Sequence, residues 1–227
     1  MNYIKNLSVS VLFFSFGINA TNTSSDDLNT HLTSETALHY ACKNGHAEKV
    51  KSLLAIPGIN VNPIEVMYGY TPLHYACDLD HADIVRELLA APGIRVDIVD
   101  KSGRTPLQTT YNKDIKNMIR KHLDEKLLEV CKKVETSAGH INHLIAMDAD
   151  VNAVDKHGYT PLHWACKSNN EKAICALLAV TGIDVTAVSS DNKTPFESTK
   201  NERVKGLLNN YTNHIQKNFY ERRIMRT

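Results

Sequence analysis

Nearly the same nine residues occur twice in this chain: Gly69–Cys77 reads GYTPLHYAC and Gly158–Cys166 reads GYTPLHWAC. Looser copies are SETALHYAC at Ser34–Cys42 and GRTPLQTTY at Gly103–Tyr111, and residues 192–196 keep the fragment NKTPF. Self-similarity at a nearly constant spacing predicts an array of similar structural units, each of which packs mainly on its neighbours. This repetition restricts the fold more than any other feature of the sequence.

Each copy contains the residues of a helix start. Thr71 and Thr160 can cap a helix through their hydroxyls, and the Pro that follows each of them costs nothing at the first helical position, where its missing N–H would be unpaired. The Gly two residues before each Thr suits a left-handed turn. A second amphipathic stretch follows, for example HADIVRELL at His81–Leu89, with apolar residues three and four apart. The predicted unit is turn, helix, helix, loop.

At this point the sequence resembles the ankyrin repeat family. The family pattern is G-x-TPLH-x-A, a second helix that ends in two leucines, and a loop of the form GADVN, and Asp150–Cys166 matches it well. The resemblance covers roughly residues 32–211. It implies an all-α solenoid of stacked helix-turn-helix units that are joined by short β-hairpin-like loops.

The spacing of the copies indicates an internal duplication. Thr105 and Thr160 are 55 residues apart, whereas the other intervals are 34 or 35, so a repeat without TPLH lies between them. Thr71 and Thr160 are 89 residues apart, as are Cys42 and Cys131. The sequence therefore predicts two homologous blocks of three repeats, which we call block one and block two.

The centre of the chain allows two interpretations, because residues 112–134 contain neither Gly nor Pro. In the preferred one, Asp124 caps a new helix after a tight turn, and the six repeats form one superhelix. In the other, one long helix breaks the array into two separately packed blocks. The apolar face of that helix would consist of Ile115, Ile119, Leu123, Leu127 and Val130.

The N-terminus differs from the repeats. Residues 1–20 contain one Lys, a twelve-residue apolar stretch at Leu7–Ile18 and a small residue at Ala20, as in a secretory signal peptide that is cleaved after Ala20. Twelve residues are too few to span a bilayer core of about 30 Å, so no membrane span is expected in the mature chain. We therefore expect a secreted or periplasmic protein. The other expected segments are a polar linker at 21–31, repeats one to three at 32–123, repeats four to six at 124–212 and a C-terminal capping helix or tail at 213–227.

Composition excludes several classes of protein. Hydrophobic residues make up 42% of the chain and charged residues 22%, which is typical of globular proteins and excludes a disordered or fibrous chain. The formal net charge of +1 argues against nucleic acid as a partner, because phosphate binding favours a basic domain. The sequence contains no Gly-rich phosphate loop, HExxH, nucleophile elbow or CxxC. We expect neither catalysis nor a cofactor.

Recurring Cys and His residues have structural interpretations. Four cysteines occupy the same site in four of the repeats, and equivalent sites in neighbouring stacked helices lie roughly 10 Å apart, beyond the reach of a disulfide. We expect Cys42, Cys77, Cys131 and Cys166 to be buried free thiols and Cys175 to be exposed. The repeat spacing likewise keeps His39, His74 and His163 from sharing a metal ion, and the resemblance implies that they hydrogen-bond the loops between repeats.

The candidate binding residues follow from the resemblance, because ankyrin repeats usually bind partners through loop tips and inner helices. They are Glu65, Met67, Tyr68, Tyr70, Asp78, Lys101, Arg104, Lys156, His157, Tyr159, Trp164 and Lys167. For Met67, Tyr68 and Tyr70 we favour binding over packing, because a hairpin tip has little core to fill. Tyr40, Tyr75 and Trp164 share one place in the motif, where they either bind a partner or fill gaps between helices.

The function class that these features favour is a protein-binding module. The chain is expected to be exported, to act as a monomer and to bind a protein partner, and in a host-associated bacterium it would be an effector that binds a host protein. The alternative is a structural or assembly scaffold in the periplasm or envelope.

Overall fold

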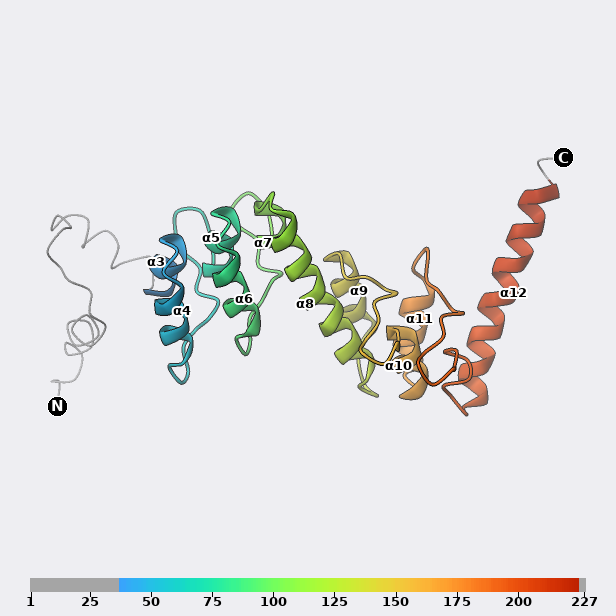
Figure 1. Cartoon of the computed structure of the whole chain (residues 1–227). Helices are drawn as coiled ribbons and strands as arrows, with labels where there is room; N and C mark the ends of the chain where they lie inside the picture. Colours follow the sequence, from blue (N-terminus) through green and yellow to red (C-terminus); the bar gives the residue numbers. More distant parts are fainter. Residues whose placement is uncertain (1–36, 225–227) are drawn as a thin grey trace, which may run out of the picture.

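The structure is a computed structural model that describes residues 37–224, with side chains described from 37 to 214. The predicted signal peptide, the predicted linker and the last residues, 225–227, lie outside the described residues. The described part is all-α: it consists of helices α3 to α12 and their connecting loops and contains no strand. The helices form an elongated, layered row with α3 and α12 at opposite ends (Figure 1). The predicted all-α solenoid is confirmed.

Block one consists of helix pairs that stack on one another. One layer contains α3 (Ala37–Lys43), α5 (Pro72–Asp78) and the single turn α7 (Pro106–Thr109). The other layer contains α4 (Ala47–Leu54) and α6 (Ala82–Ala90). Within the layers, α3 contacts α5, α5 contacts α7, and α4 contacts α6. Each helix therefore packs on its counterpart in the next unit, as in other solenoid proteins.

Block two has the same arrangement with a shortened last unit. α10 (Pro161–Lys167) pairs with α11 (Glu171–Leu178), and α11 packs on α9 (Ala138–Ala146). In the last unit, residues 195–198 form only a turn. The final helix, α12 (Glu202–Ile224), contacts α11 and runs without a break through residues 212 and 213, where a boundary was predicted.

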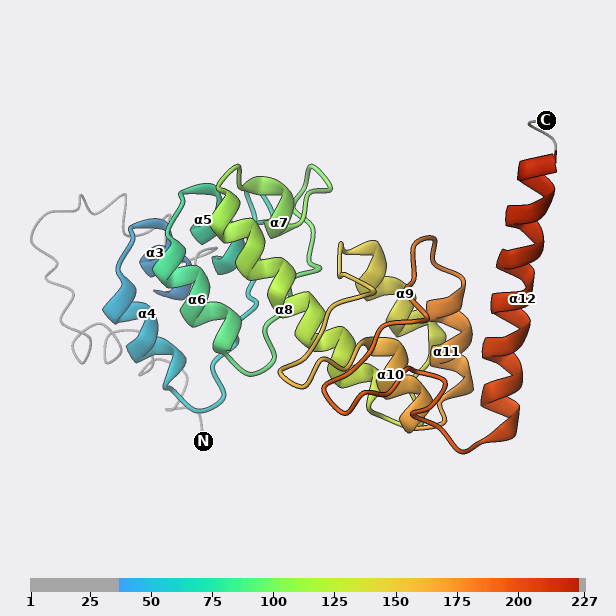
Figure 2. The same cartoon turned by 45° about the vertical axis from the view of Figure 1, so that its right-hand side comes forward.

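The two blocks share one helix, α8 (Lys113–Cys131) (Figures 1 and 2). It contacts α6 and α7 in block one and α9 and α10 in block two. Since α6 lies in the second layer of block one and α10 in the first layer of block two, α8 passes from one layer to the other. It is the second helix of one unit and the first helix of the next.

The preferred interpretation of the centre, a tight turn at Asp124, is therefore wrong. The carboxylate of Asp124 does not cap a helix but accepts a hydrogen bond from the N–H of Asp150 at 2.7 Å, in the loop after α9. The alternative, one continuous helix, is confirmed, but the separation into two separately packed blocks that it implied is wrong, because α8 joins them in one hydrophobic cluster that extends from Leu38 to Leu208. The apolar row that joins them consists of Ile115, Ile119, Leu123, Leu127 and Val130, all buried.

The helix starts are those that the sequence predicts. Thr71 is the N-cap of α5: its hydroxyl accepts the N–H of His74 at 3.4 Å, and Nδ1 of His74 accepts the N–H of Thr71 at 3.1 Å. Thr160 and His163 make the same two bonds at α10, at 3.3 and 3.1 Å. Such a reciprocal pair satisfies two backbone donors that a helix start leaves unpaired.

Hydrogen bonds that recur 89 residues apart support the duplication. Thr110 donates to the carboxylate of Asp80 at 3.2 Å, and Thr199 donates to the side chain of Asn169 at 2.8 Å. Each threonine directly follows a four-residue segment that begins its unit, which is the single helical turn α7 in block one and a turn at 195–198 in block two. A first element shortened to a single turn is therefore a shared property of the third unit in each block.

The cysteines are free, as expected. Cys42, Cys77, Cys131 and Cys166 are buried in the core, and Cys175 is exposed. Burial raises the pKa of Cys42, Cys131 and Cys166 to about 12 and also raises that of Cys77. These four thiols stay protonated at neutral pH and are poor nucleophiles.

Candidate protein-binding surface

The hairpin tip between α4 and α5 is built around Glu65. Its N–H donates to the carbonyl of Tyr70 at 2.9 Å, which closes the loop. Its carboxylate accepts the N–H groups of Met67, Tyr68 and Tyr70. Burial alone would raise the pKa of Glu65, but these donors lower it, and the net shift is downward. Only 5% of Glu65 is exposed, which corrects the expectation that it contacts a partner: it holds the tip from inside.

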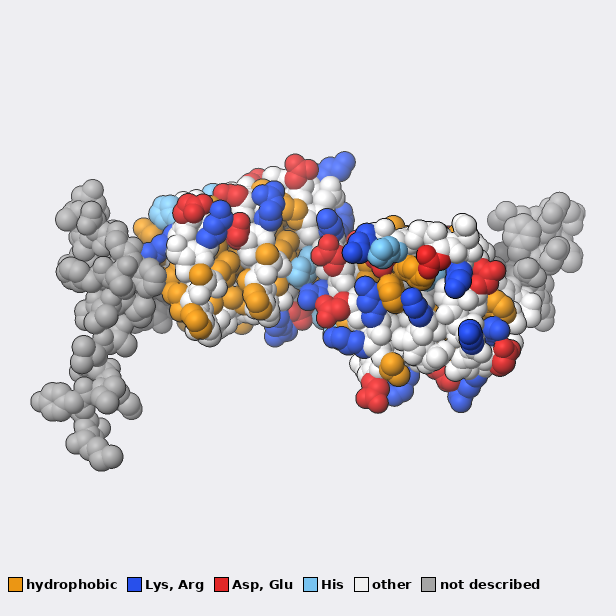
Figure 3. Space-filling view, turned by 60° about the horizontal axis from the view of Figure 1, so that its bottom comes forward, with side chains coloured by type: hydrophobic (Ala, Val, Ile, Leu, Met, Phe, Trp, Pro, Cys, Tyr) orange, Lys and Arg blue, Asp and Glu red, His pale blue; other side chains and the backbone are white. Residues whose placement is uncertain are grey.

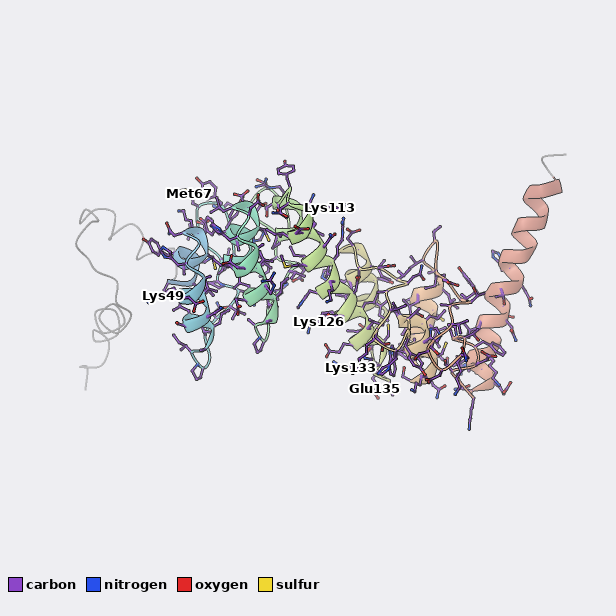
Figure 4. The ribbon with its side chains drawn as sticks, viewed as in Figure 1. Lys49, Met67, Lys113, Lys126, Lys133 and Glu135 are labelled. Atoms are coloured by element: carbon purple, nitrogen blue, oxygen red, sulfur yellow. The ribbon has the colours of Figure 1, made fainter. Side chains whose placement is uncertain are left out.

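The next three side chains point outward because Glu65 fixes the loop backbone. Val66, Met67 and Tyr68 are 66%, 69% and 56% exposed, and we call them the apolar tip. Figure 4 shows Met67 at the outer edge of block one, pointing away from the helices. The matching loop of block two closes from Asp155 to Tyr159 and is one residue shorter. The apolar tip is therefore specific to block one.

Neighbouring tips are joined through their backbones at glycines. Gly69 has a φ of 75°, and a Cβ at this position would lie 3.0 Å from the N of Lys101 in the next tip. That N–H of Lys101 donates to the carbonyl of Tyr68 at 2.9 Å. Gly158 has a φ of 71°, and a Cβ at this position would lie 3.3 Å from the N of Ser190 in the next tip. The left-handed backbone, which the sequence predicted, favours glycine, and the close approach to the next tip leaves little room for a Cβ.

The tyrosines after these glycines turn inward, which corrects two expected partner contacts. Tyr70 and Tyr159 are only 8% and 6% exposed. The ring centroid of Tyr70 lies 5.1 Å from that of Tyr75, and the ring centroid of Tyr159 lies 5.0 Å from that of Trp164. The reason is geometric: the left-handed glycine reverses the chain, so that the following side chain packs on the first helix of its own unit.

The three aromatic residues within the LHxAC motif do not share one role. Tyr75 is buried and packs between units. Its ring meets the ring of His39 edge-on, with the two ring centroids 6.0 Å apart. Tyr40 is exposed, and Trp164 is partly buried against the core. Tyr75 therefore fills a gap between helices, whereas Tyr40 and Trp164 remain accessible.

The charged candidates are on the surface, with one qualification. The exposed ones are Asp78, Lys101, Arg104, Lys156, His157 and Lys167. The guanidinium of Arg104, however, lies 2.8 Å from the carboxylate of Asp100 and donates to the hydroxyl of Tyr70 at 3.2 Å. Arg104 therefore fixes the base of its loop, which leaves less of its charge for a partner.

A lysine outside the predicted set completes a cluster in block two. The ammonium of Lys132 lies 4.5 Å from the ring centroid of Trp164, and that of Lys167 lies 4.9 Å from it. The 89-residue spacing aligns Lys132 with Lys43 and Trp164 with Tyr75. The equivalent contact exists in block one, where the ammonium of Lys43 lies 5.4 Å from the ring centroid of Tyr75. Figure 3 shows Lys and Arg side chains beside an apolar patch on block two, at the right of the view.

The recurring histidines hold adjacent units together. Nε2 of His39 lies 3.1 Å from the carbonyl oxygen of Tyr70, and Nε2 of His74 lies 3.1 Å from that of Arg104. In block two, Nε2 of His163 lies 2.9 Å from the carbonyl oxygen of Lys193. Their expected role in bonding the loops between repeats is confirmed.

The passage of α8 between layers leaves an open hollow of about 380 Å³ at the junction of the blocks. Arg120 and Asp148, whose side chains pair at 2.6 Å, lie at its wall. Among the described residues, no group of three His, Cys, Asp or Glu side chains is placed to hold a metal ion. None of the described helices is long and apolar enough to cross a membrane.

Stacked helix pairs with projecting loop tips define a solenoid repeat protein. A family model described as "Ankyrin repeats (3 copies)" matches residues 5–100, 93–189 and 127–218. These ranges cover most of the sequence, so the chain belongs to the ankyrin repeat family. The first range begins at residue 5, inside the segment predicted to be a signal peptide.

Three relatives illustrate the similarity. The chain is 35% identical over 82 residues to I-Kappa-B like protein G2 of Microplitis demolitor bracovirus, covering 36% of this chain and 48% of the relative. It is 45% identical over 58 residues to the RelA-associated inhibitor of Mus musculus, covering 25% and 7%. It is 34% identical over 94 residues to Neurogenic locus notch homolog protein 1 of Xenopus laevis, covering 36% and 4%. The chain thus spans less than half of each of these relatives.

Ankyrin repeats are generally non-catalytic scaffolds for protein interactions, and nothing in these relatives indicates an enzymatic activity. The family therefore implies a protein partner.

Proposed function

We propose that this chain is a non-catalytic, exported, monomeric protein-binding module that engages its partner through the apolar tip of block one. The observation that carries the proposal is the exposure of Val66, Met67 and Tyr68 on a loop whose backbone is fixed by the carboxylate of Glu65. A loop whose backbone is already fixed loses little conformational entropy on binding. Tyr and Met are also enriched at protein interfaces.

Two neighbouring features extend this surface. Ile64 and Val99 are exposed at corresponding positions of adjacent loops, one residue before the acidic residue that closes each loop. The next tip is hydrogen-bonded to Tyr68 through the N–H of Lys101. The apolar surface is therefore held by more than one loop. A larger exposed apolar patch of this kind is typical of a protein interaction site.

The tip proposal predicts that the double substitution Met67→Ser with Tyr68→Ser weakens partner binding by about 2 kcal/mol, roughly 30-fold. Both residues are exposed, so the melting temperature should change little. The full chain and the variant would be used to capture proteins from host and envelope fractions, and the Kd of the enriched protein would then be measured.

The matched control is Val188→Ser, which removes an exposed apolar side chain from a loop of block two. A partner that binds the wild type and both variants equally would exclude the apolar tip as the site. The fraction that yields the partner distinguishes the two roles: a host protein supports an effector, and an envelope protein supports the alternative, a periplasmic or envelope scaffold.

Export is proposed from the sequence of residues 1–20. If they form a cleaved signal peptide, the exported protein should begin at Thr21. Intact-mass measurement of the protein recovered from the culture medium or periplasm checks this. Recovery of a chain that retains Met1–Ala20 would contradict the proposal and would instead agree with the family match that begins at residue 5.

A further inference from the structure

The two blocks carry different charges at four pairs of equivalent positions in the helices and loop tips of their first layers. The equivalent pairs, 89 residues apart, are Lys43 and Lys132, Met67 and Lys156, Tyr68 and His157, and Asp78 and Lys167. In block one, these positions hold one lysine and one aspartate, and their charges cancel. In block two, three lysines and a histidine occupy the same four positions. The apolar tip is thus replaced by a basic one, and the only acid by a lysine.

The lysines of block two are held in place by aromatic rings. The ammonium groups of Lys132 and Lys167 lie 4.5 and 4.9 Å from the ring centroid of Trp164. The ammonium of Lys167 also lies 5.0 Å from the ring centroid of Tyr159. Cation–π contacts of this kind orient an ammonium without neutralising it. Two positive charges are therefore concentrated next to one partly buried ring.

The acidic groups nearby are largely engaged in other bonds. Oδ1 of Asp155 accepts the N–H groups of His157 and Tyr159, and its Oδ2 accepts the indole N–H of Trp164 at 3.0 Å and lies 4.0 Å from the ammonium of Lys132. None of the described carboxylates lies within ion-pair distance of the ammonium of Lys167. At least one ammonium of the cluster thus lacks an acidic partner.

The same holds for Lys156 at the tip, which none of the described carboxylates approaches within ion-pair distance. The carboxylate of Asp191 accepts a hydrogen bond from the hydroxyl of Tyr159. Glu129 is paired with Lys126 and Lys133, each at 3.4 Å. Interspersed carboxylates such as Glu129 and Asp155 disfavour a continuous phosphate backbone, which needs an uninterrupted basic track. Separate carboxylates on a flexible chain fit these separate lysines better.

We propose that Lys132, Lys156, Lys167 and Trp164 form a second partner site, which takes an acidic peptide segment rich in Asp and Glu. The proposal rests on the proposed function of the chain as a protein-binding module and adds a division of labour. Block one offers an apolar tip, and block two offers lysines fixed on an aromatic ring. The duplicated units have thus diverged to recognise two different chemistries.

The test uses Trp164, the single tryptophan of the chain, as a reporter. The full chain is titrated with a short Asp/Glu-rich peptide that lacks Trp and Tyr, and the tryptophan emission is recorded. We expect a saturable change that weakens as salt is raised, because screening acts on exposed charges. A peptide of the same sequence with Asn and Gln in place of Asp and Glu should cause no change.

Substitutions locate the site. Lys167→Asp restores the residue of block one, and combined with Lys132→Gln it should weaken acidic-peptide binding by about tenfold or more, since it removes two attractive charges and adds a repulsive one. The control Lys43→Gln removes the equivalent lysine of block one and should leave the titration unchanged. Circular dichroism confirms that each variant is folded.

Several outcomes would overturn the proposal. These are no change in emission with the acidic peptide, an equal response to the neutral peptide, or a response that survives loss of both lysines. A single-stranded oligonucleotide that changes the emission at lower concentrations than the peptide would show a nucleic-acid site instead. The variant Met67→Ser with Tyr68→Ser should still bind the peptide, so failure at this site and failure of the apolar tip are distinguishable.

Discussion

Leu73→Ala is expected to lower the free energy of unfolding by about 2–5 kcal/mol. Leu73 lies on α5 and is fully buried, in a layer where α5 packs between α3 and α7. Truncation leaves a cavity between helices of three successive units, and closely stacked helices collapse only partly around such a space. The measurement is urea unfolding followed by circular dichroism, with wild type and variant compared at the midpoint of the transition.

Two further variants set the scale of this effect. Leu162→Ala removes the equivalent, fully buried side chain of block two and should cost a similar amount. Tyr68→Ala removes an exposed side chain of the tip and should change stability by about 0.5 kcal/mol or less. A loss at Leu73 no larger than that at Tyr68 would show that the first-layer helices do not stack as described.

The helix starts could be predicted because their causes are local. Thr71 and His74 lie three residues apart, and their reciprocal bonds depend only on the geometry of the first helical turn. The left-handed Gly69 follows from a short turn in the same way. The stacking of units was predictable as well, since a repeated apolar face must be covered by the same face of a neighbour.

The direction of the loop tyrosines could not be predicted from the same pattern. Tyr68 and Tyr70 are separated by one glycine, and the sequence does not distinguish them as tip residues. The structure separates them because Tyr70 packs on His74 and Tyr75 of the following helix, whereas Tyr68 lies outside Tyr70, with its ring centroid 5.9 Å from that of Tyr70, and stays 56% exposed. Which tyrosine is accessible depends on where the reversed chain meets the helix, and this is a tertiary property.

Lys132 was missed for a different reason. The first unit of block two lacks the TPLH motif, so the family pattern places no site residue there. The information is present in the 89-residue spacing, which aligns Lys132 with Lys43. Within a duplicated chain, comparison of the two copies identifies contacts that comparison with the family pattern does not.

The centre of the chain was ambiguous because both interpretations satisfy the local rules. Asp124 is a good N-cap residue, and Ile115, Ile119 and Leu123 also suit a continuous helix. Tertiary contacts decide between them: the carboxylate of Asp124 bonds the N–H of Asp150, and the apolar row on α8 is covered by both blocks. The continuous helix is thus stabilised by groups that are distant in sequence.

Glu125→Pro tests this continuous helix directly, and we expect it to destabilise the protein by about 3 kcal/mol or more. In α8, position 125 is interior, so proline removes a backbone hydrogen bond and clashes with the preceding turn. If Asp124 were instead an N-cap, position 125 would be the first helical residue, where proline is well tolerated. The two arrangements therefore predict opposite results from one substitution.

The side chain of Glu125 is exposed, so Glu125→Ala controls for its loss and should change stability by about 0.5 kcal/mol or less. Two probes follow the unfolding: circular dichroism reports on both blocks, and the emission of Trp164 reports on block two. In the wild type, the core that α8 joins should make both transitions coincide. In Glu125→Pro they should separate, because a break within α8 uncouples the layers that it connects. Unchanged stability with coincident transitions in the proline variant would mean that a turn, and not a continuous helix, joins the two blocks.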